Sequence, residues 1–251
     1  MKQIWEENLK IRYNETDINN RLKVKSIFDM LQNSATSHAE DMQIGWKNLL
    51  NTGLFWILSW IKLEIDSYPK FDDGIIIKTW LKGNYKFYAL RDFMLYDINA
   101  NLFCRATTAW LLINAKSKRI TDLNSLPFEM PYFAEGGHAL DILPEKITIE
   151  NKKENVFMKK IRYSDLDLNS HVNNAKYVEI ILNIYPEEFH LENRIKSITV
   201  TYLSETKSNE ELEINLNNIA KDCSSHYIEA INQTTKKPVL KSLITWEKAK
   251  N

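Results

Sequence analysis

The chain has 251 residues, which is enough for one large domain or for two domains of ordinary size. Its composition, 44% hydrophobic and 26% charged, is typical of a globular protein with sizeable cores and argues against large-scale disorder. Thirty-three basic residues balance thirty-three acidic ones, so the sequence lacks the charge excess of a general nucleic-acid-binding protein.

The first half begins with a short β segment that ends in polar turn formers and leads into a helix. Apolar residues recur at intervals of three and four from Val24 to Met42, which predicts one buried stripe along that helix. Segments rich in β-branched and aromatic residues then predict four strands: Phe55–Ile65, Ile75–Leu81, Tyr85–Tyr96 and Ala106–Ile113. Turn formers indicate reversals between them at Asp72–Gly74, Gly83–Asn84 and Asn99–Asn101.

The second half repeats this order with a shorter helix. A stripe from Ala175 to Tyr185 predicts the helix, Asn173 or Asn174 can cap its start, and Pro186 prevents its continuation. Four more strands are predicted, with a turn at Lys236–Pro238 before the last: Ile198–Leu203, Leu212–Asn217, His226–Asn232 and Val239–Trp246.

An ungapped offset of 150 residues aligns the two halves. It brings together the following matches: Ile11, Arg12 and Tyr13 with Ile161, Arg162 and Tyr163, Asp17 with Asp167, and Asn19 with Asn169. Strands joined by short turns predict antiparallel sheets, and a striped helix needs a sheet to cover it. We therefore expect an α+β protein with two tandem domains, residues 1–135 and 155–251, joined by a linker at 136–154 that contains glycine, proline and many charges.

The densest polar motif precedes the second helix. Asp167, Asn169 and His171 are spaced by two, so in a locally extended segment their side chains would project to the same side. The start of the following helix would add unpaired backbone N–H groups and the positive end of its dipole, which suit a developing oxyanion. By itself the motif is equally compatible with a polar turn that caps a helix.

The segment from Tyr163 to Tyr177, YSDLDLNSHVNNAKY, resembles the active-site segment of the acyl-ACP thioesterases, which have two tandem hotdog domains. The resemblance extends to the downstream segment Thr201–Glu205. It implies hydrolysis of the thioester of fatty acyl-acyl carrier protein, with release of free fatty acid. It also implies catalytic positions at Asp167, Asn169, His171 and Glu205.

Plant members of that family commonly carry a cysteine beside the catalytic glutamate, where this chain has Thr206. A thiol nucleophile is therefore not expected, and the sequence favours direct attack of water on the thioester. Glu205 or His171 would act as the general base, and the sequence leaves open which one.

The first copy keeps the acid and the amide but has Arg21 where the second has His171. We expect it to be non-catalytic and, by the resemblance, to form the pocket for the acyl chain. Trp56 and Trp60 are candidate walls of that pocket, with core packing as the alternative. Each buried methylene contributes about 0.8 kcal/mol, so the depth of such a pocket would select chain length.

Two rival functions remain at this stage. An acyl-CoA thioesterase would share the motif, although two diverged domains favour the carrier protein; a non-catalytic acyl-thioester sensor would keep the pocket but could lose the base. No phosphate loop, metal cluster or nucleotide motif is found, so no cofactor and no metal are expected. The oligomeric state is open, with a homodimer as one option.

Neither export nor membrane insertion is expected. Residues 1–10 are charged, and the most apolar run, Gly53–Ile61, is far shorter than the roughly 20 residues that cross a bilayer. Cys104 and Cys223 have no CxxC spacing, which indicates neither a disulfide framework nor a zinc site. We expect reduced thiols in a cytoplasmic protein.

Overall fold

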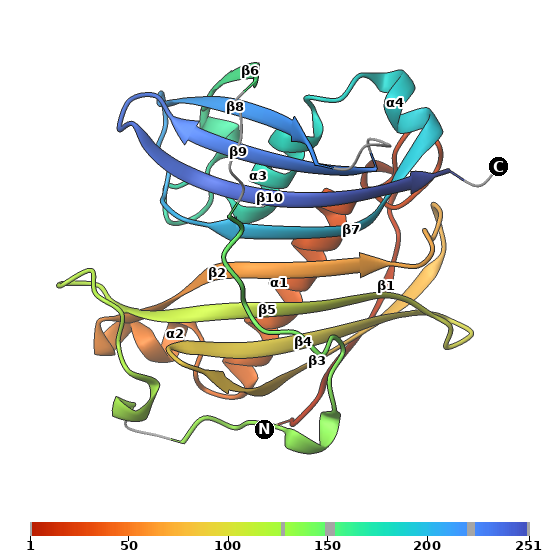
Figure 1. The fold of residues 1–251 in the computed structure, drawn as a ribbon. Helices are drawn as coiled ribbons and strands as arrows, with labels where there is room; N and C mark the ends of the chain where they lie inside the picture. Colours follow the sequence, from red (N-terminus) through yellow and green to blue (C-terminus); the bar gives the residue numbers. More distant parts are fainter. Residues whose placement is uncertain (1, 127–128, 149–153, 220–223, 250–251) are drawn as a thin grey trace. The chain divides into compact units, whose positions relative to one another are not determined.

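A computed structural model describes residues 2–126, 129–148, 154–219 and 224–249. The chain divides into two compact units, Met1–Pro144 and Glu145–Asn251, whose elements are labelled in Figure 1. No helix among the described residues is long and apolar enough to cross a membrane.

The first unit contains a five-stranded antiparallel sheet with the order β1-β3-β4-β5-β2. Its strands are β1 (Trp5–Lys10), β2 (Leu54–Ile65), β3 (Gly74–Tyr85), β4 (Tyr88–Asp97) and β5 (Leu102–Asn114). Its helices are α1 (Val24–Asp41) and the single turn α2 (Trp46–Leu49). Short 3₁₀ turns lie at Tyr13–Glu15, Leu50–Thr52, Leu123–Ser125 and Ala134–Gly136.

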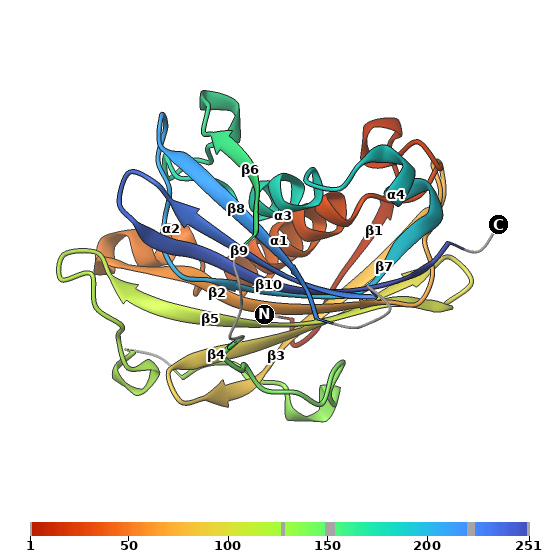
Figure 2. The same ribbon diagram turned by 45° about the horizontal axis from the view of Figure 1, so that its top comes forward.

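Helix α1 packs its predicted stripe against one face of this sheet, and Figure 2 shows the helix lying across its own strands. Ile27, Leu31 and Ala35 are all buried along the stripe. Burial of such side chains drives the pairing because each removes apolar surface from water. The expected order of one long helix followed by antiparallel strands is confirmed for this unit.

The second unit has the same topology, with the order β6-β8-β9-β10-β7. Its strands are β6 (Glu154–Lys160), β7 (Asn193–Tyr202), β8 (Glu211–Asn218), β9 (Ser225–Asn232) and β10 (Lys237–Lys248). Its helices are α3 (Asn174–Leu182) and α4 (Glu187–Glu192), and a 3₁₀ turn lies at Tyr163–Asp165. The matching strand orders are what a duplicated domain requires.

Two details differ from the sequence prediction. Gly83 and Asn84 do not form a turn but lie within β3, where the register shifts beside Gly83; the chain reverses two residues later, with Lys86 at φ 55°. Pro186 does not simply end a helix, because it is the N-cap of α4, which the sequence did not predict. Proline suits the start of a helix since its missing N–H would have no partner there.

Candidate active site

The polar motif forms a tight turn between the 3₁₀ turn Tyr163–Asp165 and α3. The Asp167 N–H donates to the His171 carbonyl at 2.8 Å, and Ser170 takes a φ of 62°. The Asp167 carboxylate accepts the Asn169 N–H at 2.8 Å, which stabilises the turn from inside. Of the two readings that the sequence left open, the segment is therefore a polar turn and not an extended strand, because the Asp167 carboxylate binds a backbone donor of the turn.

His171 and Glu205 lie in contact although they are far apart in the sequence. His171 Nε2 is 3.1 Å from Glu205 Oε2, and both side chains reach solvent, with exposed fractions of 26% and 53%. A carboxylate can only accept a hydrogen bond, so its place beside Nε2 favours the imidazole tautomer with the proton on that nitrogen. In the neutral imidazole, Nδ1 then carries the free lone pair.

Backbone hydrogen bonds on both sides fix the position of this pair. Glu205 follows the end of β7, where the Leu203 N–H donates to the Val239 carbonyl at 2.8 Å. Beyond Glu205, the Thr206 carbonyl accepts the Val172 N–H at 3.0 Å. The residues next to Glu205 and His171 are thus bonded to each other.

Asp167 and Asn169 lie in the same turn, and Asp167 is bonded to His171 through the backbone, but their side chains form no hydrogen bond with this pair in the described residues. The Asn169 side chain is exposed and forms no hydrogen bond with a described residue. The side chain of Asp167 is engaged by the turn itself. The structure therefore brings together two of the four predicted catalytic side chains.

The start of α3 offers fewer free donors than the sequence indicated. Asn173 is the N-cap, and its Oδ1 accepts the Ala175 N–H at 2.8 Å. Its carbonyl accepts the N–H groups of Lys176 and Tyr177. Among the backbone N–H groups in the first turn of α3, the Asn174 N–H forms no hydrogen bond with a described residue.

The first copy builds the same turn with different side chains. The Asp17 N–H donates to the Arg21 carbonyl at 2.8 Å, and the Leu22 N–H donates to the Pro69 carbonyl at 2.8 Å. Arg21 takes the place of His171 and binds the Asp17 carboxylate at 3.0 Å. The Pro69 carbonyl thus plays the part of the Thr206 carbonyl, and Tyr68 stands where the second copy has Glu205. At this turn of the described first unit, no imidazole and carboxylate pair is formed.

Trp56 and Trp60 lie on opposite faces of β2 because the register of the strand shifts between Leu58 and Trp60. Trp56 packs near Leu49 on the helical side, and its Nε1 donates to the Ile44 carbonyl at 2.9 Å. Trp60 is buried against Leu90 and Ala109, with Ile142 beside them in the segment that follows the first sheet, residues 129–144, here called the connector. The structure does not bring the two tryptophans together.

Two further histidines and one cysteine are buried and have structural roles. His38 is fully buried and bonded to Arg91, and His226 is buried and bonded to the Tyr185 hydroxyl at 2.8 Å. Cys104 is a buried free thiol, and Cys223 lies outside the described residues. No cluster of three metal-binding side chains is found in the ranges that the structure describes.

Two family models account for almost the whole chain. Residues 2–125 match the acyl-ACP thioesterase N-terminal domain, and residues 147–248 match the acyl-ACP thioesterase C-terminal domain. The chain belongs to the acyl-ACP thioesterase family.

Named relatives in this family include plant enzymes. The chain is 26% identical to the palmitoyl-acyl carrier protein thioesterase, chloroplastic, of Arabidopsis thaliana over 80% of this chain and 52% of that protein. It is also 26% identical to the oleoyl-acyl carrier protein thioesterase 2, chloroplastic, of the same plant over 82% of this chain and 60% of that protein. The chain thus spans little more than half the length of the curated relatives that it matches.

Two solved structures share the fold over nearly their full lengths. An acyl-ACP thioesterase from Bacteroides thetaiotaomicron gives a TM-score of 0.84 at 23% identity and covers 98% of both chains. The 12:0-ACP thioesterase from Umbellularia californica gives 0.85 at 19% identity and covers 99% of both chains. The predicted α+β fold with two hotdog domains is confirmed.

Proposed function

We propose that the chain hydrolyses the thioester of fatty acyl-acyl carrier protein and releases the free fatty acid. The observation that carries this proposal is the 3.1 Å contact of His171 Nε2 with Glu205 Oε2, set in the C-terminal domain of an acyl-ACP thioesterase. The names of the plant relatives supply the substrate class.

In the proposed reaction, a water molecule attacks the thioester carbon and gives up a proton as it does so. His171 Nδ1 is the base that this contact favours, because the Glu205 carboxylate beside Nε2 favours a proton on that nitrogen and stabilises the imidazolium that forms. The same proton then passes to the departing thiolate of the carrier, and the acid product keeps the oxygen of the water. Glu205 Oε1 is the alternative base.

Three further groups complete the proposed site. Asn169 orients the carbonyl or the water with its exposed amide, and Asp167 keeps the turn closed. The Asn174 N–H, at the positive end of α3, stabilises the oxyanion. Thr206, at the position where plant members carry a cysteine, is completely buried, so its hydroxyl is not placed to act as a nucleophile.

We also propose that the first domain, expected at residues 1–135, is non-catalytic and receives the acyl chain. Leu123, in the buried cluster against which Trp56 packs, also lines an open pocket of about 530 Å³. The other residues that line this pocket are both apolar and polar: Leu126, Met130, Asn84, Asn124, Glu129 and Tyr132. Neither Trp56 nor Trp60 lines it, so their role as pocket walls rests on the resemblance.

Substitution of His171 or Glu205 tests the proposal. We expect His171→Ala and Glu205→Ala to lower acyl-ACP hydrolysis by about 10²- to 10⁴-fold, the usual contribution of general acid–base catalysis. Arg21→Ala, at the same turn position in the first copy, is the matched control and should keep most activity. Release of fatty acid from purified acyl-ACP is measured together with circular dichroism; near-parental turnover in a folded variant would remove that residue from the mechanism.

The proposal also states which carrier bears the acyl group, where the protein is located and whether it forms a homodimer. Hydrolysis of one acyl group from acyl carrier protein and from CoA separates the two carriers, and tight binding without release would indicate a sensor. The buried free thiol of Cys104 supports a cytoplasmic location. Light scattering distinguishes a homodimer from a monomer.

A further inference from the structure

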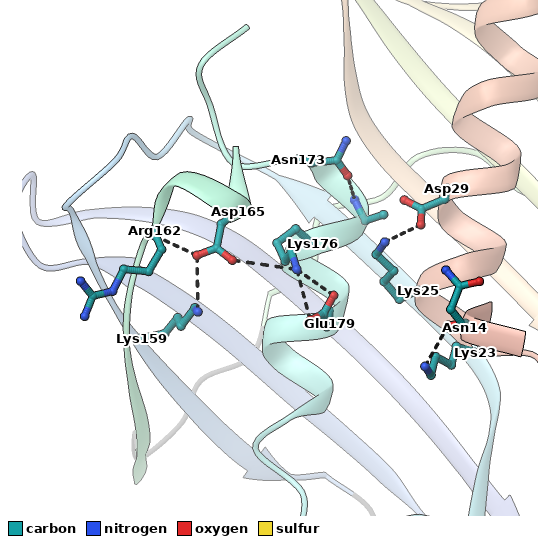
Figure 3. Close-up of polar contacts among 11 residues, drawn as sticks. Asn14, Lys23, Lys25, Asp29, Lys159, Arg162, Asp165, Asn173, Lys176 and Glu179 are labelled. Atoms are coloured by element: carbon teal, nitrogen blue, oxygen red, sulfur yellow. Dashed lines mark hydrogen bonds and ion pairs between the residues drawn. The ribbon is translucent and has the colours of Figure 1, made fainter. Parts of the chain in front are cut away.

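Asp165 is a buried carboxylate at the base of the site turn, and the sequence did not single it out. Its side chain is 5% exposed and accepts the Arg162 N–H at 2.9 Å. Lys159 Nζ on β6 lies 3.4 Å from one carboxylate oxygen, and Lys176 Nζ on α3 lies 4.0 Å from the other. Figure 3 shows the carboxylate between these two ammonium groups, with the guanidinium of Arg162 directed away from it.

The backbone of Asp165 closes the turn that carries His171. Its N–H donates to the Arg162 carbonyl at 3.0 Å, and its carbonyl accepts the N–H of Asn173, the N-cap of α3, at 3.1 Å. Asp165 therefore connects the strand before the turn, the turn itself and the helix after it.

Lys176 occupies the first turn of α3, where a positive charge opposes the helix dipole. Two carboxylates offset this charge, since Glu179 lies 3.0 Å away on the same helix and Asp165 approaches from the turn. The resulting chain of charges links Lys159, Asp165, Lys176 and Glu179 (Figure 3).

The first copy makes the same backbone closure without the lysines. The Glu15 carboxylate accepts the Arg12 N–H at 2.7 Å, and the Glu15 carbonyl accepts the Lys23 N–H at 2.8 Å. The positions of Lys159 and Lys176 are filled there by Leu9 and Ser26. The turn thus folds without the ion network, and the network accompanies the copy that has the imidazole and the carboxylate in contact.

We propose that Asp165, held by Lys159 and Lys176, is a positioning residue that keeps His171 against Glu205 for the hydrolysis proposed above. Its backbone bonds shape the turn, and its charge holds β6 and the first turn of α3 to that turn. Small displacements of reacting groups are costly, and about 1 Å can cost 10²-fold in rate. Asp165 touches neither substrate nor water in this role.

The test compares Asp165→Asn with Glu15→Gln, the matched change in the first copy. Asparagine keeps an acceptor for the Arg162 N–H but loses the charge. We expect Asp165→Asn and Lys176→Met each to lower kcat by about 10- to 100-fold while KM changes less than about threefold. Glu15→Gln should leave both constants unchanged, and Asp165→Glu should recover most of the rate.

Imidazole ¹⁵N NMR of His171 gives a second measurement that does not depend on turnover. We expect Asp165→Asn to shift the Nε2 resonance and Glu15→Gln to leave it in place. A parental kcat in folded Asp165→Asn would overturn the inference while leaving the proposed function intact. If the parental protein itself fails to release fatty acid, the proposed function fails, and an unshifted His171 resonance in Asp165→Asn would then separately exclude the positioning role.

Discussion

At the residue scale, two side chains distinguish copies whose turns are otherwise built alike. Arg21 is held by the Asp17 carboxylate at 3.0 Å, whereas His171 lies 3.1 Å from Glu205. A guanidinium remains protonated at neutral pH and cannot accept a proton from water, but a neutral imidazole can. Both copies have the same backbone turn, so the turn alone does not provide the proposed chemistry. It depends on which side chains the turn carries.

Substitution of Thr206 tests whether a hydroxyl beside Glu205 takes part in the reaction. It is fully buried, and its hydroxyl lies against the Tyr177 phenol without a hydrogen bond of standard geometry. We expect Thr206→Val to keep turnover within about threefold, and to change the free energy of unfolding by less than about 1 kcal/mol, because no well-formed hydrogen bond is lost. Steady-state hydrolysis and urea unfolding check both values; a loss above 10²-fold in a stable variant would show that the hydroxyl takes part in the reaction.

At the element scale, α1 is tied to β4 and to the N-terminal strand by a buried histidine. Arg91 Nη1 donates to His38 Nδ1 at 2.9 Å, and His38 Nε2 donates to the Lys2 carbonyl at 2.8 Å. The Trp5 ring stacks on the imidazole. Burial and then the charge of Arg91 lower the pKa of His38 from 6.5 to about 4, while the Lys2 carbonyl and Asp41 oppose this shift.

This histidine makes the stability of the protein depend on pH. The unfolded chain takes up a proton at His38 as the pH falls below 6.5, but the folded chain resists it until the pH approaches 4. Stability is therefore fully present above 6.5 and falls between pH 6.5 and 4, by about 3 kcal/mol from this group. We expect His38→Gln, which can keep both hydrogen bonds, to flatten this part of the profile; His138→Gln is the exposed control. Urea unfolding at pH 4 to 7 measures the slopes, and equal slopes in parental protein and His38→Gln would contradict the assignment.

At the scale of the whole molecule, repeated periodicity predicted the order of the elements and the α+β class, whereas the hotdog fold was implied by the family resemblance. The stripe on α1 and the alternating strands define two sheets because apolar spacing records which face is buried. The turn at Gly83–Asn84 was misplaced since glycine marks a bulge as readily as a reversal. Helix α4 was missed because six residues are too few to show a period.

The contacts within the candidate site could not be predicted from the sequence. Its residues came from a motif and a resemblance, but the contact between His171 and Glu205 depends on how β7 ends beside the turn, which no spacing encodes. Lys159 and Lys176 look like surface charges in a strand and a helix, so the ion network around Asp165 has no sequence signal of its own.

The connector that follows the first sheet is held by a buried ion pair. Lys82 and Asp92 lie 3.2 Å apart, with side chains 4% and 0% exposed. The Ala139 N–H donates to Asp92 Oδ2 at 2.7 Å, and Lys82 Nζ donates to the Leu140 carbonyl at 2.8 Å. Burial raises the pKa of Asp92, while Thr107, Lys82 and the Ala139 N–H oppose the shift, so the carboxylate depends on these partners for its charge.

Removal of one partner should therefore destabilise the first unit and release the connector. We expect Lys82→Met to cost about 3–5 kcal/mol, because it leaves a buried carboxylate without its counter-charge. Lys82→Met with Asp92→Asn should cost less than Lys82→Met alone, since no buried charge remains. Lys62→Met, which breaks the half-exposed pair of Lys62 with Glu64, is the control and should cost less than about 1 kcal/mol. Urea unfolding gives the free energies, and limited proteolysis reports cleavage in the connector; a single variant that is no less stable than the double variant would show that the pair does not anchor this segment.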